Sequence, residues 1–248
     1  MKNKLLKGIA LPAIMLALLV SMIAAPQPAA AAQKVPVNLI TKCTASGPYS
    51  GSSTIKYTYK NGLIRTTVDE YTTKFKYSGT KSLRMTAPGY YINFGYTKKG
   101  KFKSAKTKGY KYKVTKRKNG RVQVVKKYES SSKKPFQITT ISYNKKGHIS
   151  KVVGTFDYTN EKSVVRYYYD SKGNVVKEKY PSQTLTHKYT YKDGKVISQY
   201  NSDWKTTAKY TYKKCWVPKK YAKRVKKQQW AIINYNGYVD DLPLTMVY

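Results

Sequence analysis

Basic side chains give this chain its clearest capacity to bind another molecule. The 248 residues include 49 lysines and arginines against 11 aspartates and glutamates, a formal net charge of +38 at pH 7. Lysine supplies 43 of the basic residues and arginine only six. A lysine acts as a diffuse point charge, whereas the arginine fork reads bases and binds phosphate through two hydrogen bonds. The bias argues against sequence-specific nucleic-acid recognition and predicts loose attraction to a polyanion: a teichoic-acid-like polymer, an anionic polysaccharide or an anionic membrane surface.

The candidate binding residues lie on the basic faces of the last predicted strands, on a predicted C-terminal helix, and at one tryptophan expected to stack on sugar rings. They are Lys188, Lys192, Lys209, Lys213, Lys219, Lys220, Lys223, Arg224, Lys226, Lys227 and Trp204. A simpler interpretation is that the lysines only keep the sheet soluble and stop strands from pairing at its edges. Solubility requires a net charge of only about 2–8 for a small domain, so we favour binding.

Side chains for catalysis or metal binding are scarce. The two histidines, His148 and His187, fall in a repeat turn and on a predicted strand. A metal site or a base–nucleophile pair needs several converging partners, and the sequence has no group of His, Cys and Asp at ligand spacing. Asp170 and Asp193 occupy turn positions, which explains both residues. We therefore expect a non-enzymatic protein with no catalytic residue, metal or cofactor.

The two cysteines, Cys43 and Cys215, lie far apart in the chain. An even number of cysteines in an exported protein favours a disulfide. Closing so long a loop would stabilise the fold by roughly 4–5 kcal/mol in the chain-entropy model. The alternative is two buried free thiols. Sequence does not fix the distance between the residues, so both interpretations stay open.

A short unit is written three times in succession near the end of the chain. The copies read VVRYYYDSKGNVV, LTHKYTYKDGKVI and TAKYTYKKCWV, and weaker copies surround Gly62, Gly100, Gly120 and Gly147. Aromatic and basic residues alternate, which places them on opposite faces of a strand. Tyrosine at strand spacing also predicts a core built largely from tyrosine rings. Two residues after each repeat glycine comes an apolar residue that should face this core: Ile64, Phe102, Val122, Ile149, Val175 and Val196.

The turns between the strands have a clear signature. Asn61-Gly62, Asn119-Gly120 and Asp193-Gly194 are the dipeptides preferred in two-residue hairpin loops, where both positions need positive φ. We predict an all-β fold in which serial antiparallel β-hairpins form a curved sheet or an open barrel, with one short C-terminal helix. The sequence fixes neither the closure of the sheet nor the oligomeric state.

The stretch Tyr167 to Val175, YYYDSKGNV, resembles the YD repeat of bacterial RHS-type and wall-associated proteins. The similarity covers roughly residues 55–217, but only the unit at Asp170 has the aspartate of the signature in place. The resemblance implies a β-hairpin repeat architecture. Large YD-repeat proteins build β-sheet shells around toxin domains, and we expect this chain to be too short for such a shell.

The ends of the chain differ in composition from its middle. Residues 1–32 have the charged start, the apolar stretch and the Ala30-x-Ala32 site of a secretory signal peptide, which predicts a mature N-terminus at Gln33. We expect a lead-in over 33–53, a β-hairpin repeat domain over 54–217 with a looser insert at 69–88, and a basic helix and tail over 218–248. The helix is predicted from Pro218 to Ile233, with the apolar side chains of Tyr221, Val225 and Trp230 packed on the sheet and six basic residues facing outward.

Together these features predict a secreted, extracellular or envelope-associated β-repeat protein. Its expected function is to bind an anionic cell-envelope polymer or an acidic extracellular glycan through a surface rich in lysine and tyrosine. Two alternatives from other classes remain. One is a structural, matrix-forming protein whose sheet edges self-assemble, and the other is an envelope enzyme whose site cannot be recognised from sequence.

Overall fold

The computed structural model describes residues 33–48, 51–157, 159 and 161–235, together with the backbone of 238–239 and 242–243. The predicted signal peptide, 1–32, and its cleavage site lie outside the described residues, as do the side chains of the tail beyond residue 234. Residues 34–248 make up one compact unit.

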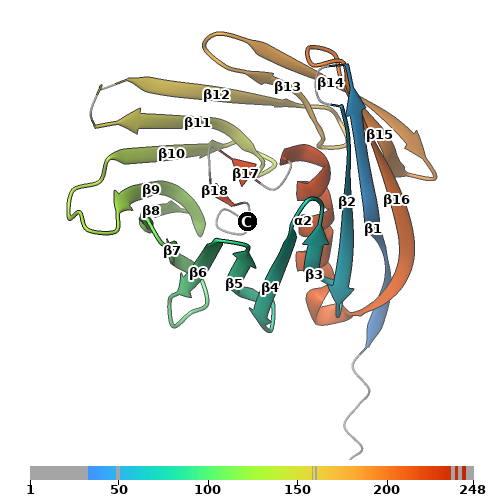
Figure 1. The fold of residues 1–248 in the computed structure, drawn as a ribbon, viewed down its shortest axis with the longest axis horizontal. Helices are drawn as coiled ribbons and strands as arrows, with labels where there is room; N and C mark the ends of the chain where they lie inside the picture. The colour runs from blue at the N-terminus through green and yellow to red at the C-terminus, as the bar shows by residue number, and fades with distance from the viewer. Residues whose placement is uncertain are drawn as a thin grey trace, which may run out of the picture. The chain divides into compact units, whose positions relative to one another are not determined.

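The described chain is almost entirely strand, with one helix near its end (Figure 1). The elements are β1 (Lys34–Gly47), β2 (Gly51–Lys60), β3 (Leu63–Val68), β4 (Thr72–Ser78), β5 (Lys81–Ala87), β6 (Tyr90–Tyr96), β7 (Phe102–Lys106), β8 (Tyr110–Lys118), β9 (Arg121–Glu129), β10 (Gln137–Tyr143), β11 (Ile149–Phe156), β12 (Lys162–Tyr169), β13 (Val175–Lys179), β14 (Thr184–Lys192), β15 (Lys195–Asn201), β16 (Thr206–Pro218), α2 (Lys219–Tyr235), β17 (Tyr238–Val239) and β18 (Leu242–Pro243).

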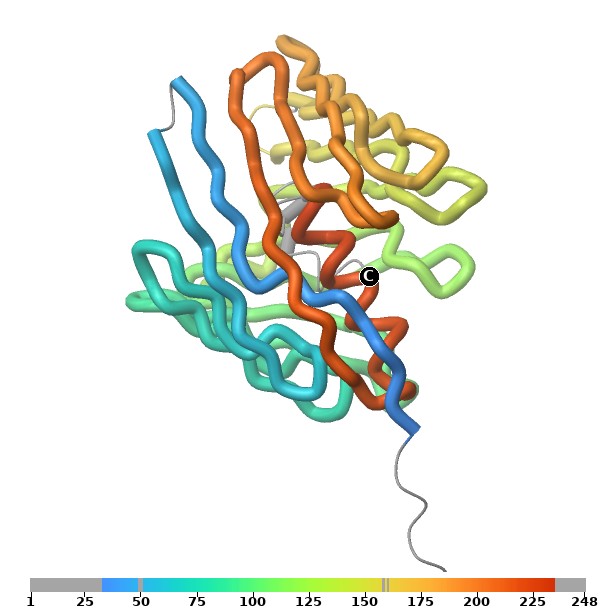
Figure 2. Tube along the Cα trace, turned by 90° about the vertical axis from the view of Figure 1, so that its right-hand side faces the viewer, coloured from blue at the N-terminus to red at the C-terminus, as the bar shows by residue number. Residues whose placement is uncertain are grey.

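Strands β1 to β16 form one antiparallel sheet that closes into a barrel. Each strand pairs with its neighbours in sequence, and β1 closes the ring by pairing with β16 from Lys34↔Pro218 to Ser46↔Thr207. Figure 2 shows β1 alongside β16, with α2 continuing from the end of β16. The all-β prediction with one short C-terminal helix is confirmed. The sheet is closed, whereas the sequence left a curved sheet or an open barrel as the alternatives.

Two segments that the sequence placed outside the regular pattern belong to the sheet. Residues 34–47 of the expected lead-in, 33–53, form β1, and residues 51–53 begin β2. The expected looser insert, 69–88, contains β4 and β5, which form another hairpin with Gly79 in its turn at φ 57°. This hairpin fills the gap in the repeat between Gly62 and Gly100. The pattern was hidden because Ser78-Gly79-Thr80 lacks the Asn-Gly or Asp-Gly signature.

The predicted two-residue turns are present. Asn61 and Gly62 have φ of 54° and 80°, and Asp193 and Gly194 have φ of 49° and 71°, so both central positions are left-handed. Asn119-Gly120 has the same geometry. Because consecutive strands alternate in direction, all turns that carry a repeat glycine lie at one end of the barrel. We call it the glycine end, and it carries Gly62, Gly79, Gly100, Gly120, Gly147, Gly173 and Gly194.

Neighbouring hairpins separate toward the glycine end, and tyrosine hydroxyls span the gap. The pairing of β9 with β10 stops at Val124↔Thr140, and beyond it Tyr143 Oη donates to the carbonyl oxygen of Val122 at 2.7 Å. We call such contacts tyrosine bridges. Others join Tyr59 to Ile40, Tyr96 to Ser82, Tyr169 to Ile149, Tyr189 to Val175 and Tyr212 to Val196. Between β8 and β7, the guanidinium of Arg117 takes the place of a tyrosine hydroxyl and donates a hydrogen bond to the carbonyl oxygen of Phe102.

The core consists mainly of aliphatic residues rather than tyrosine rings. Ile40, Ile141, Ile149 and Val175 are completely buried. Only three tyrosines, Tyr112, Tyr167 and Tyr210, are among the buried apolar residues that the structure describes. Of the six residues expected to face the core two places after a repeat glycine, Ile64 is only partly buried, and its neighbour Leu63 is buried instead. The other five are buried. Many tyrosines bridge strands because a hydroxyl needs a polar partner when it is buried.

Helix α2 packs on the glycine end of the sheet, as predicted. Its Val225 is completely buried beside Leu63 and Val217. Gln229 Oε1 accepts a hydrogen bond from the backbone N–H of Ile40 at 2.6 Å, and Asn234 Oδ1 accepts one from Val175 at 2.6 Å. The helix therefore reaches from β1 to β13. It begins one residue later than predicted, because Pro218 still pairs with Lys34 in the sheet.

Candidate anion-binding site

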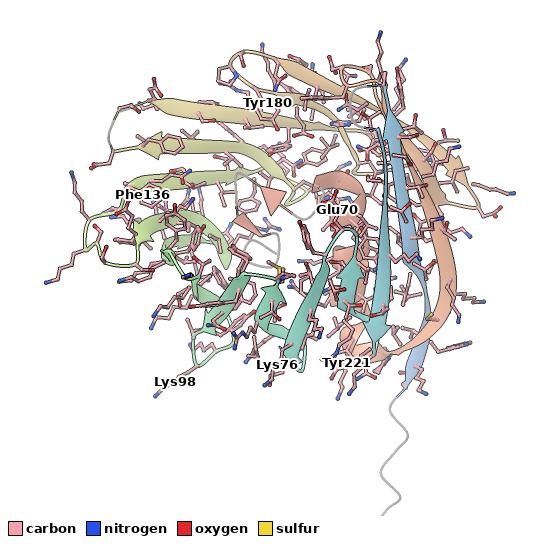
Figure 3. All side chains as sticks on the ribbon, in the orientation of Figure 1. Glu70, Lys76, Lys98, Phe136, Tyr180 and Tyr221 are labelled. Atoms are coloured by element: carbon pink, nitrogen blue, oxygen red, sulfur yellow. The ribbon has the colours of Figure 1, made fainter. Side chains whose placement is uncertain are left out.

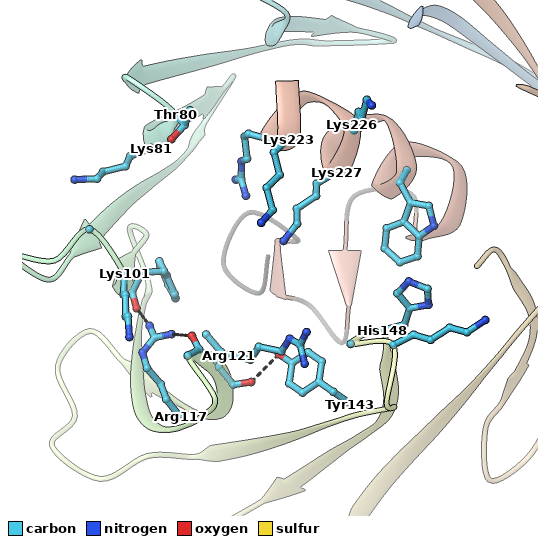
Figure 4. Close-up of a pocket in the computed structure, with 18 of the residues that line it drawn as sticks. Thr80, Lys81, Lys101, Arg117, Arg121, Tyr143, His148, Lys223, Lys226 and Lys227 are labelled. Carbon is cyan, nitrogen blue, oxygen red and sulfur yellow. Dashed lines mark hydrogen bonds between the residues drawn. The ribbon is translucent and has the colours of Figure 1, made fainter. Parts of the chain in front are cut away.

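A cavity of about 730 Å³ lies at the glycine end beside α2. Turns of the sheet form one wall, at Thr80, Gly100, Gly120 and Gly147, and α2 forms the opposite wall (Figure 4). The helix thus covers one part of the glycine end, and the cavity occupies another part. We call this cavity the glycine-end pocket.

The lining of the glycine-end pocket is strongly basic. Ten of its twenty lining residues are lysine or arginine, and none of the described lining residues is aspartate or glutamate. The basic residues are Lys81, Lys101, Arg117, Arg121, Lys146, Lys172, Lys223, Arg224, Lys226 and Lys227. A wall of one charge sign in a concave site focuses its field on the enclosed volume and attracts ions of the opposite charge.

Two local patterns bring these side chains together. In the sheet, basic residues stand next to repeat glycines, as Lys101 follows Gly100 and Lys146 precedes Gly147. On α2, Lys223 and Lys227 are four residues apart and share one side of the helix, while Val225 and Gln229 are buried. Figure 4 shows Lys223 and Lys227 extending from α2 toward Arg121 on the facing wall.

Neutral groups hold two arginines of the sheet wall in place. Arg117 donates to the carbonyl oxygen of Gly120 at 3.2 Å and to that of Phe102. The Arg121 guanidinium lies 5.5 Å from the centre of the Tyr143 ring and directly against Gly147, where a Cβ would collide with it. Gly147 has φ of 86°, which favours glycine there, whereas the guanidinium is the end of a flexible side chain and could move away from a Cβ. These contacts orient the guanidinium groups without neutralising their charge.

An aromatic wall completes the pocket. His148 stacks on Trp230 with ring centres 5.4 Å apart, and the Trp230 indole donates to the carbonyl oxygen of Gly173 at 2.9 Å. His148 also packs against Tyr169, at 4.9 Å between ring centres. The Nδ1 atom of His148 is buried without a hydrogen-bond partner among the described residues. The pocket therefore offers ring faces as well as cations.

The cations of the pocket perturb one another. Burial lowers the pKa of Lys227 below its ordinary value, and the neighbouring charges of Arg224, Lys223 and Arg121 lower it further. Burial, followed by the charges of Lys146 and Arg121, lowers the pKa of His148. Burial and nearby like charges both disfavour the protonated form, so these shifts reflect first the burial of the two groups and then the crowding of positive charge around them.

The structure brings together four of the predicted binding residues and separates the rest. Lys223, Arg224, Lys226 and Lys227 line the pocket. Arg224 is only partly exposed, although the helix was expected to direct all six basic residues outward. The exposed candidates outside the pocket are Lys188 and Lys192 on β14, Lys209 and Lys213 on β16, Lys219 and Lys220 at the start of α2, and Trp204 in the turn before β16. Figure 3 shows other basic side chains, such as Lys98, projecting away from the ring.

Sequence reasoning missed the six basic residues that the sheet contributes. They are Lys81, Lys101, Arg117, Arg121, Lys146 and Lys172. The usable signal was that five of them lie within three residues of a repeat glycine recognisable in the sequence, whereas Lys81 lies beside Gly79, whose turn lacks the signature. Once all repeat turns are assigned to the same end of one sheet, basic residues beside them must gather there.

Cys43 and Cys215 are both free, as the second interpretation had it, but each is only partly buried rather than buried. On the paired strands β1 and β16, Cys43 lies opposite Tyr210, whereas Cys215 lies opposite Val37. Several strand residues at about 3.3 Å each therefore separate them, far more than a disulfide spans. The predicted bridge does not form within this fold.

A second polar cluster involves the other histidine. His187 Nε2 lies 2.9 Å from Glu178 Oε1, and His187 Nδ1 lies 3.0 Å from Gln199 Nε2. Tyr180 donates to Glu178 Oε2 at 2.9 Å, and Tyr210 donates to Gln199 Oε1 at 2.9 Å. Each polar side-chain atom that these contacts join has a protein partner, which is typical of a structural network in a core.

In the part of the chain that the structure describes, three or more His, Cys, Asp or Glu side chains do not gather anywhere in a way that would hold a metal ion. The helix in this part is not long and apolar enough to cross a membrane.

Comparison with known proteins finds weak matches to small parts of solved structures. No family model and no curated protein matches the sequence. The crystal structure of TcdB2-TccC3-Cdc42 matches 62% of this chain at 15% identity and a TM-score of 0.33. The Photorhabdus luminescens Tc holotoxin pore with the TccC3-D651A mutation matches 60% at 17% identity and a TM-score of 0.26. The matched regions cover only 9% and 8% of those chains.

Proposed function

We propose that this protein is a non-enzymatic anion-binding protein whose ligand is held in the glycine-end pocket. One observation carries the proposal: ten basic residues from several turns and one helix surround a single cavity, and no carboxylate is among its described lining residues. Bringing like charges together opposes folding. An anion that enters the pocket removes that repulsion, and its binding free energy is added to the stability of the fold.

The exposed lysines have a supporting role in this proposal. Lys188, Lys192, Lys209 and Lys213 are spread over the strands and do not converge on one point. Spread charge raises the rate of encounter with an anionic partner and is screened by salt, with a screening length of about 8 Å near 0.15 M. We therefore assign the first encounter with the anionic ligand to the lysine-rich exterior. The glycine-end pocket then holds the bound ligand. An extracellular or envelope location, an anionic polymer there as partner, and a relationship to YD-repeat proteins are parts of the same proposal.

The closed sheet weighs against assembly through strand edges. Each of β1 to β16 is paired on both sides, and closure removes the edges through which strands of different molecules would pair. The packing of α2 likewise weighs against membrane binding through the buried side of this helix. Val225, Gln228 and Gln229 are buried within the protein, so this side of the helix does not face a lipid surface.

Tryptophan fluorescence provides a test that is specific to the pocket. Trp230 lines the pocket, whereas Trp204 and Trp216 are 52% and 65% exposed. The variant Trp204→Phe/Trp216→Phe retains Trp230 as its only tryptophan. We expect polyphosphate to change its emission in a saturable way, with an affinity that falls as salt rises, and neutral dextran to leave it unchanged. Equal responses to both polymers, or no response to any anion, would contradict the proposal.

A further inference from the structure

The type of cation in the glycine-end pocket differs from that in the rest of the chain. Three of the six arginines line it, but only seven of the 43 lysines. Arginine presents a rigid planar fork that binds carboxylate or phosphate through two hydrogen bonds, and it is favoured where an oxyanion is recognised by geometry. Lysine still supplies seven of the ten pocket cations, but the share of arginine is higher there than in the chain as a whole, so geometric recognition of an oxyanion is added to loose attraction.

The arginines are placed before any ligand arrives. Two backbone carbonyls hold Arg117, and Tyr143 and Gly147 confine Arg121. Each guanidinium has five N–H donors, and the hydrogen bonds of Arg117 to Gly120 and Phe102 use only part of that capacity. Groups fixed in this way lose little conformational entropy when they bind a ligand.

The charge and size of the pocket restrict the ligand. Ten formal positive charges surround about 730 Å³. A phosphate monoester carries about −1.5 to −2 at neutral pH and three acceptor oxygens, so a few neighbouring phosphates supply charge at a matching density. An acidic polysaccharide carries its charges on separate sugar rings and delivers fewer into the same volume. The pocket thus fits clustered phosphates better than dispersed carboxylates.

We propose that the glycine-end pocket binds a cluster of three or more phosphate groups, through Arg121 and Arg117 on the sheet side and Lys223 and Lys227 on α2. This inference rests on the proposed anion-binding function and specifies its ligand chemistry. The same chemistry has two sources: a compact multiply phosphorylated molecule, or the end of a long polyphosphate chain. Both present adjacent phosphates to the two facing walls.

Calorimetry on the purified protein at about 0.15 M salt provides the test, because at this ionic strength attraction between distant exposed charges is largely screened. The probes are tripolyphosphate, inositol hexakisphosphate and long-chain polyphosphate, compared with citrate, sucrose octasulfate and poly(glycerol phosphate), whose phosphates are separated by glycerol. The pocket variant is Arg121→Gln/Lys223→Gln/Lys227→Gln, which removes one exposed cation from the sheet wall and two from α2. The control, Lys188→Gln/Lys192→Gln/Lys209→Gln, makes the same change in net charge on exposed strand positions.

We expect the three clustered phosphates to bind at least about tenfold more tightly than the comparison anions, a difference of about 1.4 kcal/mol. The pocket variant should lose about tenfold or more in affinity for tripolyphosphate, and the control less than about twofold, since exposed, isolated charges contribute little. Circular dichroism and melting curves establish that both variants are folded. If long-chain polyphosphate binds several protein molecules and tripolyphosphate does not bind at 1:1, the protein binds along the polymer and the inference is overturned, whereas tripolyphosphate binding at 1:1 supports it.

The two proposals fail in different ways. If citrate, the sulfated sugar or poly(glycerol phosphate) binds as tightly as tripolyphosphate and the pocket variant weakens them all, anion binding stands and the preference for clustered phosphates is wrong. If no anion binds, or the control variant loses as much affinity as the pocket variant, the pocket is not the site and both proposals fail.

Discussion

The hydroxyl of Tyr212 on β16 donates a 2.7 Å hydrogen bond to the carbonyl oxygen of Val196 on β15, at a point where these two strands are no longer paired. The last backbone pair between them is Ser198↔Lys209, and Ser198 lies two residues after Val196 on β15. The same relationship recurs in other repeats, as in Tyr143 and Val122. A tyrosine near the end of one strand thus satisfies a carbonyl of the preceding hairpin as the strands separate toward the glycine end.

Removal of one bridging hydroxyl should have a measurable effect on stability. Tyr212→Phe keeps the ring and removes the donor to Val196, so we expect a loss of about 0.5–1.5 kcal/mol in the free energy of unfolding. The control is Tyr168→Phe, because Tyr168 is 40% exposed and its hydroxyl can be replaced by water contacts. Urea denaturation should show the control within about 0.5 kcal/mol of the parent. Equal losses in the two variants would mean that the bridge adds nothing.

The Asp193-Gly194 turn provides a test of backbone strain without side-chain collision. A Cβ at Gly194 would meet no atom within 4 Å, but its φ of +71° is unfavourable for any β-branched residue. Gly194→Val should therefore cost about 1–2 kcal/mol, or several degrees in melting temperature for a chain of this size. Gly109→Val is the matched control, because Gly109 has equally open surroundings and is not among the glycines with positive φ. A parent-like melting temperature for Gly194→Val would refute the turn geometry.

Because both cysteines are free, reducing agents should not change the stability of the protein. Dithiothreitol should leave the melting temperature unchanged, since a native disulfide would contribute about 2–5 kcal/mol that reduction removes. Burial raises the pKa of Cys43 to about 11. The nucleophile is the thiolate, so only about one Cys43 in a thousand is reactive at pH 8 and alkylation with iodoacetamide should be slow. The unfolded protein should react at both cysteines at ordinary rates. Rapid alkylation of Cys43 in the folded protein would contradict this prediction.

The stability of the protein should fall in mild acid because of His148. Burial, Lys146 and Arg121 hold its pKa below the usual value, which is about 6.5 in the unfolded chain. As pH falls through 6.5 the unfolded chain takes up this proton first, so stability decreases until the pH passes the folded pKa. Above pH 6.5 neither state is protonated, and the effect is absent.

His148→Gln isolates this contribution. The melting temperature of the variant should fall less than that of the parent between pH 7 and pH 5, while His187 remains as the second histidine in both proteins. Tripolyphosphate should also reduce the difference, because a bound anion stabilises protonated His148. Parallel pH profiles of parent and variant, with and without the anion, would show that His148 does not titrate as proposed.

The local elements were predictable from sequence, but their closure was not. Asn61-Gly62 and Asp193-Gly194 identify turns because the required φ is a property of two adjacent residues. The spacing of Tyr221, Val225 and Trp230 identified α2 for a similar reason, since helical periodicity is local. The pairing of β1 with β16 joins opposite ends of the sheet, and no short-range pattern in Lys34–Gly47 reveals its partner.

The residues of the candidate site were likewise predictable where they are neighbours in sequence, and not where distant pairing brings them together. Lys223 and Lys227 were recognised because they stand close together in a basic helix. Arg117, Arg121 and Lys146 were not, since they meet only after all the hairpins pair in order and the turns come to one end. Whether Cys43 forms a disulfide with Cys215 could not be decided from the sequence for a related reason. The distance between them depends on strand register, which is set by the closure of the whole ring.

The pairing of β1 with β16 has a consequence for the order of events in folding. The two strands that close the ring come from opposite ends of the described sheet, so closure is among its most non-local contacts, and non-local topologies fold slowly. Until it occurs, both strands present unpaired backbone edges, which in concentrated solution are sites of misassociation. Lys42 on β1 and Lys209 and Lys213 on β16 are exposed along these edges. Such charges act as gatekeepers, because two open chains whose edges carry the same charge repel each other. These lysines thus protect the chain during the interval before the ring closes, whatever the finished protein binds.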